Sequence, residues 1–132
     1  MRAVLDTNIF ISGIHWAGSP REVLWAWYSG KFELVTSPAI LDELSETLST
    51  FRIIISQERL ERWRNAITGK SIIVTPTNLI RAVQDPDDNK FIEAAVEGNA
   101  DFIVSKDKHL LELKKYDKIE ILTPEEFLEK IC

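Results

Sequence analysis

The sequence predicts an α/β fold, a three-layer α/β/α sandwich around a central, mostly parallel sheet of four to five short strands. Short apolar runs rich in valine and isoleucine recur along the chain, as in strands that are covered on both faces. Amphipathic helical segments separate these runs, which indicates parallel strands joined by right-handed crossovers. The length of 132 residues suits one domain, and no internal repeat, low-complexity segment or linker divides residues 1–132.

Five segments are expected to form the strands, because each is short, apolar and rich in β-branched residues. In chain order they span residues 3–5, 32–36, 72–74, 102–105 and 119–122. The carboxyl ends of parallel strands meet at one edge of a sheet, and ligands bind beyond that edge. Residues that directly follow these segments are therefore the first candidates for a functional site.

Capping residues and proline mark where the intervening helices begin. Residues 19–22 (Ser-Pro-Arg-Glu) and 123–126 (Thr-Pro-Glu-Glu) both match a capping box with proline at the first helical position. The sequence also predicts a helix over residues 37–50 and another that begins near Ser56. A further helix follows the Asp-Pro-Asp segment and extends over residues 88–97, where glycine and asparagine end it.

The composition is that of an ordinary globular protein. Apolar residues make up 45% of the chain and charged residues 28%, which is sufficient for a substantial core. No apolar stretch approaches the roughly 20 residues of a membrane span, and the single cysteine, Cys132, allows no internal disulfide. We therefore expect a cytoplasmic protein without membrane association. With a net charge of −5 and no Lys/Arg-rich stripe, any contact with nucleic acid would depend on bound metal and scattered basic side chains.

Four acidic residues lie where the apolar segments end: Asp6, Glu43, Asp88 and Asp107. Asp6 and Asp107 follow the first and the fourth predicted strand, at the sheet edge where ligands bind. Glu43 lies on the shoulder of the apolar arc of its helix, whereas the neighbouring Asp42 faces water. Asp88 lies in the middle of an apolar helix face, where an acid is rare unless it is paired or bound to metal.

Each acid also has an ordinary structural explanation. Asp6 suits a turn after a strand, Asp88 and Asp107 suit helix N-termini, and Glu43 could simply be solvated. Together, however, four acids at one sheet edge would repel one another strongly without a cation. Carboxylates without histidine or cysteine favour Mg²⁺ or Mn²⁺ over zinc. Two such ions, about 4 Å apart, can activate a water molecule and stabilise the leaving oxygen of a phosphodiester.

Four segments, in this order, resemble those of a PIN domain, the nuclease fold of VapC-type toxins and related ribonucleases. They are residues 4–8 (Val-Leu-Asp-Thr-Asn), 37–44 with its acid, 85–91 (Asp-Pro-Asp-Asp-Asn-Lys-Phe) and 101–107 (Asp-Phe-Ile-Val-Ser-Lys-Asp). The resemblance covers nearly the whole chain. The form of residues 85–91 is similar to a subgroup often described as toxins of toxin–antitoxin systems.

The resemblance implies catalytic and metal-binding roles for the four acids Asp6, Glu43, Asp88 and Asp107, with Asn8 and Ser105 as supporting polar groups. It implies cleavage of single-stranded RNA by water with Mg²⁺ or Mn²⁺, often by a homodimer that a small antitoxin inhibits. The roles of Asp85 and Asp87 stay open, because the third acid of the family can also be matched to either of these two residues. The helical position is the reason for choosing Asp88.

Three other functions fit the sequence less well. Haloacid-dehalogenase-like phosphatases need a second aspartate two residues after the first, where this chain has Asn8. Response-regulator receivers phosphorylate an aspartate after the third strand, where this chain has residues 75–77 (Thr-Pro-Thr). The non-enzymatic alternative is a catalytically silent PIN-like RNA-binding or scaffold protein. It would be expected if one acid were missing, but all four are present.

Overall fold

The computed structural model describes residues 1–50, 55–83 and 85–131, which contain one six-stranded sheet of order β3-β2-β1-β4-β6-β5. All neighbouring strands are parallel except β5 and β6, which are antiparallel. The predicted fold class is confirmed, and each predicted strand is present to within one residue at either end. The strands are β1 (Arg2–Leu5), β2 (Glu33–Thr36), β3 (Ile72–Ile73), β4 (Phe102–Val104), β5 (Lys115–Tyr116) and β6 (Ile119–Leu122).

The sequence analysis did not predict β5. This strand has two residues and forms a tight hairpin with β6, in which Asp117 takes a positive φ of 53°. A segment so short and so rich in lysine has no apolar run by which a strand can be recognised. Its antiparallel pairing gives one edge of the otherwise parallel sheet a charged strand.

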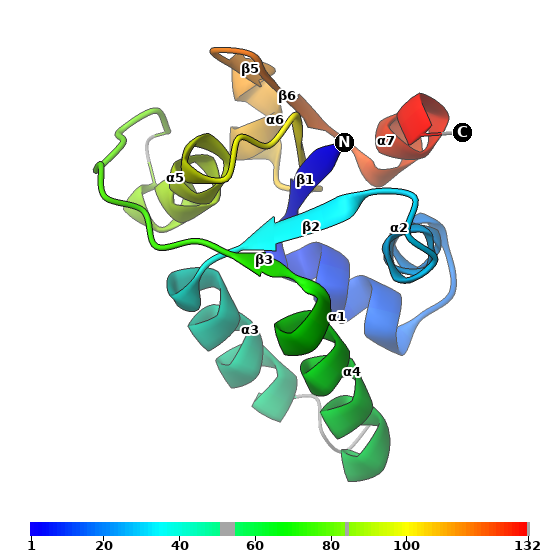
Figure 1. Cartoon of the computed structure of the whole chain (residues 1–132). Helices are drawn as coiled ribbons and strands as arrows, with labels where there is room; N and C mark the ends of the chain where they lie inside the picture. The colour runs from blue at the N-terminus through cyan, green and yellow to red at the C-terminus, as the bar shows by residue number, and fades with distance from the viewer. Residues whose placement is uncertain (51–54, 84, 132) are drawn as a thin grey trace.

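Helices cover both faces of the sheet (Figure 1). They are α1 (Thr7–His15), α2 (Ser19–Tyr28), α3 (Pro38–Thr50), α4 (Gln57–Lys70), α5 (Asn89–Glu97), α6 (Lys108–Leu113) and α7 (Pro124–Ile131), with a 3-10 turn, η1 (Pro86–Asp88), before α5. α1 is new, because the sequence analysis expected only a turn after Asp6. None of the helices in the described ranges is both long and apolar enough to cross a bilayer.

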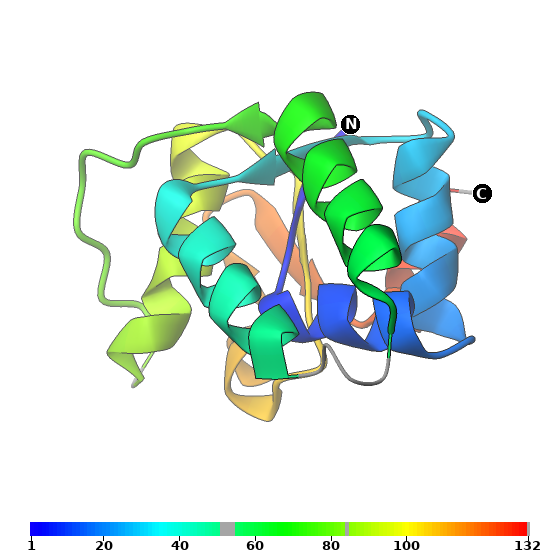
Figure 2. The same ribbon diagram turned by 90° about the horizontal axis from the view of Figure 1, so that it is seen from below.

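The core lies in two layers, one on each face of the sheet. On β1, Ala3 and Leu5 face the layer built with α1, α2 and α7, whereas Val4 faces the layer built with α5. β4 alternates in the same way, with Ile103 on the α5 side. This alternation with full burial on both faces is why the central strands read as continuous apolar runs. Figure 2 shows α3 and α4 side by side at one end of the sheet.

The two helices that were predicted to begin with a capping box, α2 and α7, are capped differently. At α7, Thr123 and Glu126 exchange hydrogen bonds of 3.0 and 3.1 Å, which confirms the predicted capping box. At α2, Gly18 is the N-cap instead of Ser19, and no side chain caps the helix. Gly18 has a φ of 136°, a conformation that glycine adopts without strain. The predicted capping box over residues 19–22 is therefore wrong, although the helix begins where it was expected.

Candidate active site

The parallel pairing of β1 with β4 brings Asp6 and Ser105 together. Leu5 lies opposite Val104 in the sheet, so the residues that follow these two strands become neighbours. The backbone N–H of Asp6 donates to the carbonyl of Val104 at 3.0 Å. The hydroxyl of Ser105 donates to Oδ2 of Asp6 at 2.6 Å, and both side chains are buried.

Asp6 is also the N-cap of α1. Its Oδ1 accepts from the backbone N–H of Asn8 at 3.3 Å. The capping explanation for Asp6 is therefore correct, but it uses one oxygen only. Asn8 was expected to support the site with its side chain, which instead lies exposed, and its recorded contact with Asp6 is through the backbone.

Ser105 links a second acid to the same edge. Its hydroxyl oxygen accepts from the backbone N–H of Asp107 at 2.8 Å, while the same hydroxyl donates a hydrogen bond to Asp6. Asp107 then caps α6, because its Oδ1 accepts from the backbone N–H of His109 at 2.8 Å. One buried hydroxyl thus joins the two turns that carry Asp6 and Asp107.

Glu43 reaches the site from α3. It is half-buried, whereas Asp42 and Glu46 on the same helix are exposed, as helical geometry predicted. Its Oε1 accepts from the hydroxyl of Thr7, and its Oε2 forms an ion pair with Lys90. The sequence analysis assigned no role to Thr7, which directly follows Asp6, and it did not predict the ion pair between Glu43 and Lys90.

Asp88 is the last residue of η1 and the N-cap position of α5, where its side chain makes no capping hydrogen bond. Capping therefore does not explain this acid. Burial raises the pKa of Asp88 to about 6, and repulsion by Asp107, Asp85 and Asp6 adds to the shift, while Lys90 opposes it.

The four acids interact electrostatically. Burial raises the pKa of Asp6 above its usual range, opposed by hydrogen bonds from Ser105 and from the Asn8 backbone. Repulsion from Asp107 and Glu43 raises this pKa further. Since Asp88 in turn is repelled by Asp107 and Asp6, all four predicted acids contribute to one acidic cluster.

The two acids whose roles were open behave differently from Asp88. Asp85 and Asp87 are both exposed. Oδ1 of Asp85 accepts from the backbone N–H of Asp87 at 3.0 Å, which is a local turn contact. Asp85 also adds to the repulsion that raises the pKa of Asp88, so it lies beside the acidic cluster.

A family model described as the PIN domain matches residues 2–109. The chain belongs to the PIN domain family. The resemblance inferred from the four sequence segments is therefore confirmed. PIN domains are generally nucleases, so membership of the family supports hydrolysis of nucleic acid.

Over an alignment of 144 residues, this PIN domain is 35% identical to the uncharacterized protein MJ1680 of Methanocaldococcus jannaschii, with 98% of this chain and 91% of that protein covered. A chain of VapBC2 from Rickettsia felis, crystallised with a DNA fragment from their promoter, matches with a TM-score of 0.56 and 16% identity. A chain of FitAcB from Neisseria gonorrhoeae matches with a TM-score of 0.54 and 11% identity. Both matches cover 92% of this PIN domain and 97% of the other chain, and at these identities they show a common fold.

Three side chains on α5 hold the segment that leads to Asp88. Oδ1 of Asn89 accepts from the backbone N–H groups of Ala82 and Val83, both at 3.0 Å. Glu93 accepts from the N–H of Ile80 at 2.9 Å, and Glu97 accepts from Thr77. Because these three acceptors recur every four residues, they line one stripe of α5 and fix the path of residues 77–83. Sequence reasoning missed this stripe.

The donor groups of the cluster suit a hard divalent cation. They are carboxylate oxygens beside a serine hydroxyl, which is the ligand chemistry of Mg²⁺ and Mn²⁺. A cation would also relieve the repulsion that raises the pKa of Asp6 and of Asp88. Within the described ranges, no three His, Cys, Asp or Glu side chains are close enough to enclose an ion as they stand. The donor atoms therefore suit the metal. The acids stand too far apart to enclose an ion while Glu43 is paired with Lys90.

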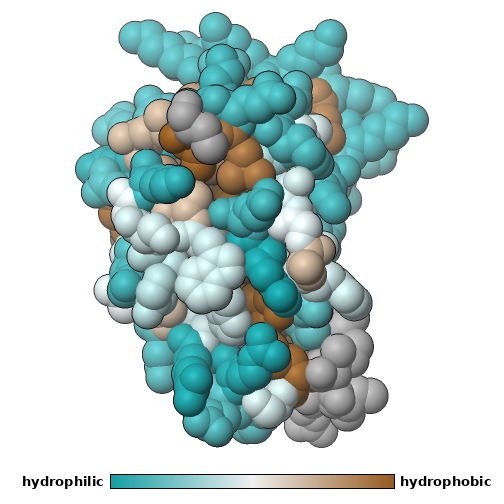
Figure 3. Space-filling view, turned by 90° about the vertical axis from the view of Figure 1, so that its right-hand side faces the viewer, coloured by the Kyte–Doolittle hydropathy of each residue, from teal (hydrophilic) through white to brown (hydrophobic). Residues whose placement is uncertain are grey.

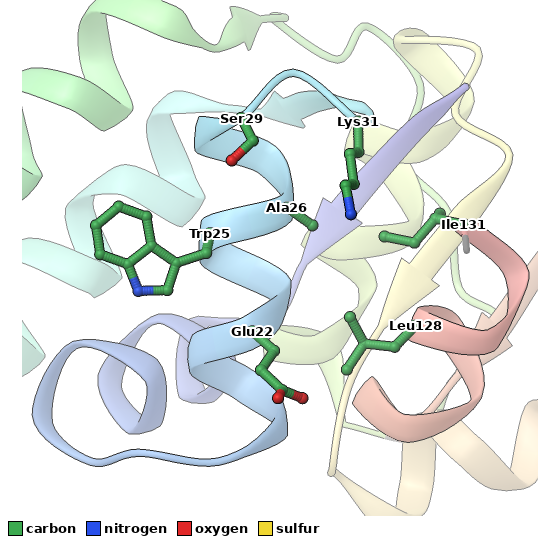
Figure 4. A pocket seen from close by; sticks show the side chains of 7 residues that line it. All are labelled: Glu22, Trp25, Ala26, Ser29, Lys31, Leu128 and Ile131. Atoms are coloured by element: carbon green, nitrogen blue, oxygen red, sulfur yellow. The ribbon is translucent and has the colours of Figure 1, made fainter.

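A separate groove lies between α2 and α7, away from the acids (Figure 4). It has a volume of about 370 Å³ and is lined by Glu22, Trp25, Ala26, Ser29, Lys31, Leu128 and Ile131. The groove contains none of the four acids and offers one carboxylate only, so it does not suit phosphodiester chemistry. Figure 3 shows the same side of the molecule, where pale and apolar side chains gather between hydrophilic ones.

Proposed function

We propose that this PIN domain is a divalent-metal-dependent endoribonuclease that hydrolyses phosphodiester bonds in single-stranded RNA in the cytoplasm. The observation that supports the proposal is the mutual electrostatic influence of Asp6, Glu43, Asp88 and Asp107 beyond the ends of β1 and β4. Acids whose pKa is raised by burial and by neighbouring carboxylates, as for Asp6 and Asp88, are typical of catalytic sites. The family supports nuclease activity, and the acids are the ligands that such chemistry needs.

In this proposal Asp6, Glu43, Asp88 and Asp107 hold Mg²⁺ or Mn²⁺, which when bound would make water more acidic and stabilise charge on the leaving oxygen. Ser105 keeps Oδ2 of Asp6 in place and also orients the turn of Asp107. Asp88 or Asp107 orients the attacking water, whose oxygen bonds to phosphorus as the ester P–O bond breaks. Its proton passes to a carboxylate of the cluster, and the leaving oxygen takes up a proton from solvent water.

We further propose that the protein is the toxin of a type II toxin–antitoxin pair and that a small antitoxin inhibits it. The likeness of the fold to chains of VapBC2 and FitAcB supports this proposal. A neighbouring reading frame for a small DNA-binding protein, and suppression of the RNase activity when that protein is added, would test it. An active protein whose activity no co-encoded partner suppresses would argue against the toxin role.

We propose that the functional form is a homodimer built on the groove between α2 and α7. Trp25 and Tyr28 are 52% and 47% exposed on α2, which is unusual for such large side chains. Glu22 and Lys31 lie at opposite ends of the groove (Figure 4). A two-fold axis through its middle would place Glu22 of one copy against Lys31 of the other. Sedimentation should give twice the chain mass for the wild type and the monomer mass for Trp25→Glu.

The test of the nuclease proposal uses the purified full chain and an end-labelled single-stranded RNA. Cleavage should require added Mg²⁺ or Mn²⁺ and stop with EDTA. Asp6→Asn should lower the rate about 100-fold or more, because a carboxylate that carries both charge and position is lost. Asp42→Asn removes one acid from the exposed face of α3 and should leave the rate unchanged.

Cleavage that persists in EDTA or in Asp6→Asn would refute the proposed site. Binding of the RNA without any cleavage, in the presence of either metal, would instead favour the catalytically silent RNA-binding alternative.

A further inference from the structure

Lys90 brings a positive charge into the acidic cluster. Its ammonium forms the ion pair with Glu43, and its side chain is 15% exposed, less than the 36% of its partner. The same charge opposes the rise in the pKa of Asp88, so the ammonium lies near both acids. The nitrogen is also 5.2 Å from the centre of the Phe91 ring. A lysine with so little exposure is uncommon unless a partner holds it in place.

Both oxygens of Glu43 are engaged, one by the hydroxyl of Thr7 and the other by Lys90. The nuclease proposal assigns Glu43 to a divalent cation, which needs the same carboxylate oxygens as ligands. Two cations that compete for one carboxylate oxygen weaken each other's binding. We therefore expect the ammonium of Lys90 to withdraw from Glu43 when a metal ion binds there.

An ammonium released from Glu43 would remain beside the acids at which the substrate phosphate is proposed to react. Lys90 is in the first turn of α5, two residues after Asp88, so its backbone is fixed beside the acids. The substrate of the proposed reaction carries one negative charge for each phosphate, and lysine is a common contact of phosphate oxygens. Without its Glu43 partner, the ammonium would have a charge available for a phosphate of the proposed substrate.

We propose that Lys90 is the resident counter-ion of Glu43 in the metal-free acidic cluster and a phosphate-positioning residue in the metal-loaded one. This inference depends on the nuclease function proposed above. It describes an exchange in which the divalent cation takes Glu43 and the ammonium passes to a phosphate oxygen of the RNA. The site would then bind substrate tightly only after the metal has bound.

The first test measures Mn²⁺ binding by isothermal titration calorimetry, without substrate. Removal of the competing ammonium in Lys90→Met should tighten Mn²⁺ binding about tenfold, the scale of one neighbouring charge. Lys90→Arg keeps the charge and should not tighten it. Lys106→Met is the matched control, because Lys106 is exposed beside Asp107 and its loss removes the same charge outside the Glu43 pair. Its effect should be clearly smaller.

The same titration separates failure of this inference from failure of the proposed function. If the wild type binds no Mn²⁺, or if Glu43→Gln binds it as well as the wild type, the proposed metal site is wrong. If Glu43→Gln weakens Mn²⁺ binding but Lys90→Met leaves it unchanged or weaker, the site stands and the counter-ion role of Lys90 is overturned.

The second test uses the wild-type chain and so does not depend on the folding of a variant. Lysines are labelled briefly with an acetylating reagent, and the extent at each is read by peptide mass spectrometry. Saturating Mg²⁺ should raise labelling of Lys90 several-fold, because the amine is released from Glu43, and should leave the exposed Lys118 unchanged. Labelling of Lys90 that is unchanged or reduced by Mg²⁺ would overturn the exchange.

The phosphate role has a kinetic signature of its own. At saturating Mn²⁺, Lys90→Met should raise KM for RNA several-fold and lower kcat less, because a substrate contact is lost while the metal ligands stay. A fall in kcat at constant KM would contradict a positioning role.

Discussion

Ser105 donates a 2.6 Å hydrogen bond to Asp6, although 99 residues separate them in the sequence. The same hydroxyl accepts from the backbone of Asp107, so one side chain fixes two of the four candidate acids. Ser105 is fully buried and Asp6 nearly so, which means that water cannot replace this bond easily. The contact exists because β1 and β4 are parallel neighbours whose carboxyl ends coincide.

Replacement of this serine should destabilise the metal-free protein. Ser105→Ala leaves the buried carboxylate of Asp6 without one donor, and the loss of a bond to a charged group costs about 1–3 kcal/mol. The pKa of Asp6 should rise further, because Ser105 normally lowers it. Urea unfolding gives the change in free energy. Ser49→Ala, which removes an exposed hydroxyl on α3, should change it by less than about 0.5 kcal/mol; equal losses in both variants would contradict the role of Ser105.

Asp88 should make the metal-free protein less stable as the pH rises. Its pKa in the folded protein, about 6, is above the ordinary value of 3.8, so the folded state binds this proton more tightly than the unfolded chain. The folded state therefore loses stability as the pH increases through that interval. Asp88→Asn should raise the unfolding free energy by about 1 kcal/mol at neutral pH, a value reduced for solvent screening of a half-exposed group. Below about pH 4 the two proteins should unfold alike.

Bound metal should reverse the order of stability of the wild type and Asp88→Asn. Saturating Mg²⁺ stabilises the protein that binds it, so it should raise the melting temperature of the wild type more than that of Asp88→Asn. Thermal melts with and without Mg²⁺, at two pH values, measure both effects. A variant that is less stable than the wild type at neutral pH without metal would show that Asp88 is a structural acid.

Much of the site could be predicted from the sequence because strand ends and helix faces have fixed geometry. Parallel strands place Asp6 and Ser105 at the same edge of the sheet, regardless of the path of the loops. Helical periodicity distinguished Glu43 from the exposed Asp42. Asp88 was assigned to a helix face and lies instead in the 3-10 turn before α5. It still belongs to the acidic cluster, since Asp107 and Asp6 repel it.

The parts that were missed depend on contacts that leave no pattern in the sequence. α1 was read as a turn, because Asp, Thr and Asn favour turns and the apolar run after them is short. With α1 unrecognised, the contact of Thr7 with Glu43 could not be foreseen. The ion pair of Lys90 and Glu43 joins α5 to α3, and the two residues are 47 positions apart in the sequence. The bonds of Asn89 go to backbone N–H groups, which every sequence supplies equally.

Asn89 should control the segment before Asp88. Its side chain is buried, accepts from the backbone N–H groups of Ala82 and Val83, and donates to the backbone carbonyl of Val83. Asn89→Ala leaves two partly buried N–H groups without their acceptor, so we expect a loss of about 1 kcal/mol. Hydrogen exchange should become faster at the amides of Ala82 and Val83. Asn65→Ala, on the exposed side of α4, should leave stability unchanged or slightly higher, because alanine favours helices; unchanged exchange at residues 82 and 83 in Asn89→Ala would refute this role.

Two helical glycines should respond in opposite ways to the same substitution. In α1, a Cβ at Gly13 would lie 2.6 Å from Cδ1 of Leu24 and 2.9 Å from the backbone oxygen of Pro20. Gly13→Ala must therefore push α1 away from α2, and such overpacking costs about 1–3 kcal/mol. In α4, a Cβ at Gly69 meets nothing within 4 Å, so Gly69→Ala should stabilise by about 0.5 kcal/mol through helix propensity. Because α1 begins at the turn of Asp6 and carries Thr7, Gly13→Ala should also lower RNase activity, whereas Gly69→Ala should not. Thermal unfolding and the RNA cleavage assay measure both effects, and a stable, fully active Gly13→Ala would show that the contact between α1 and α2 does not position the site.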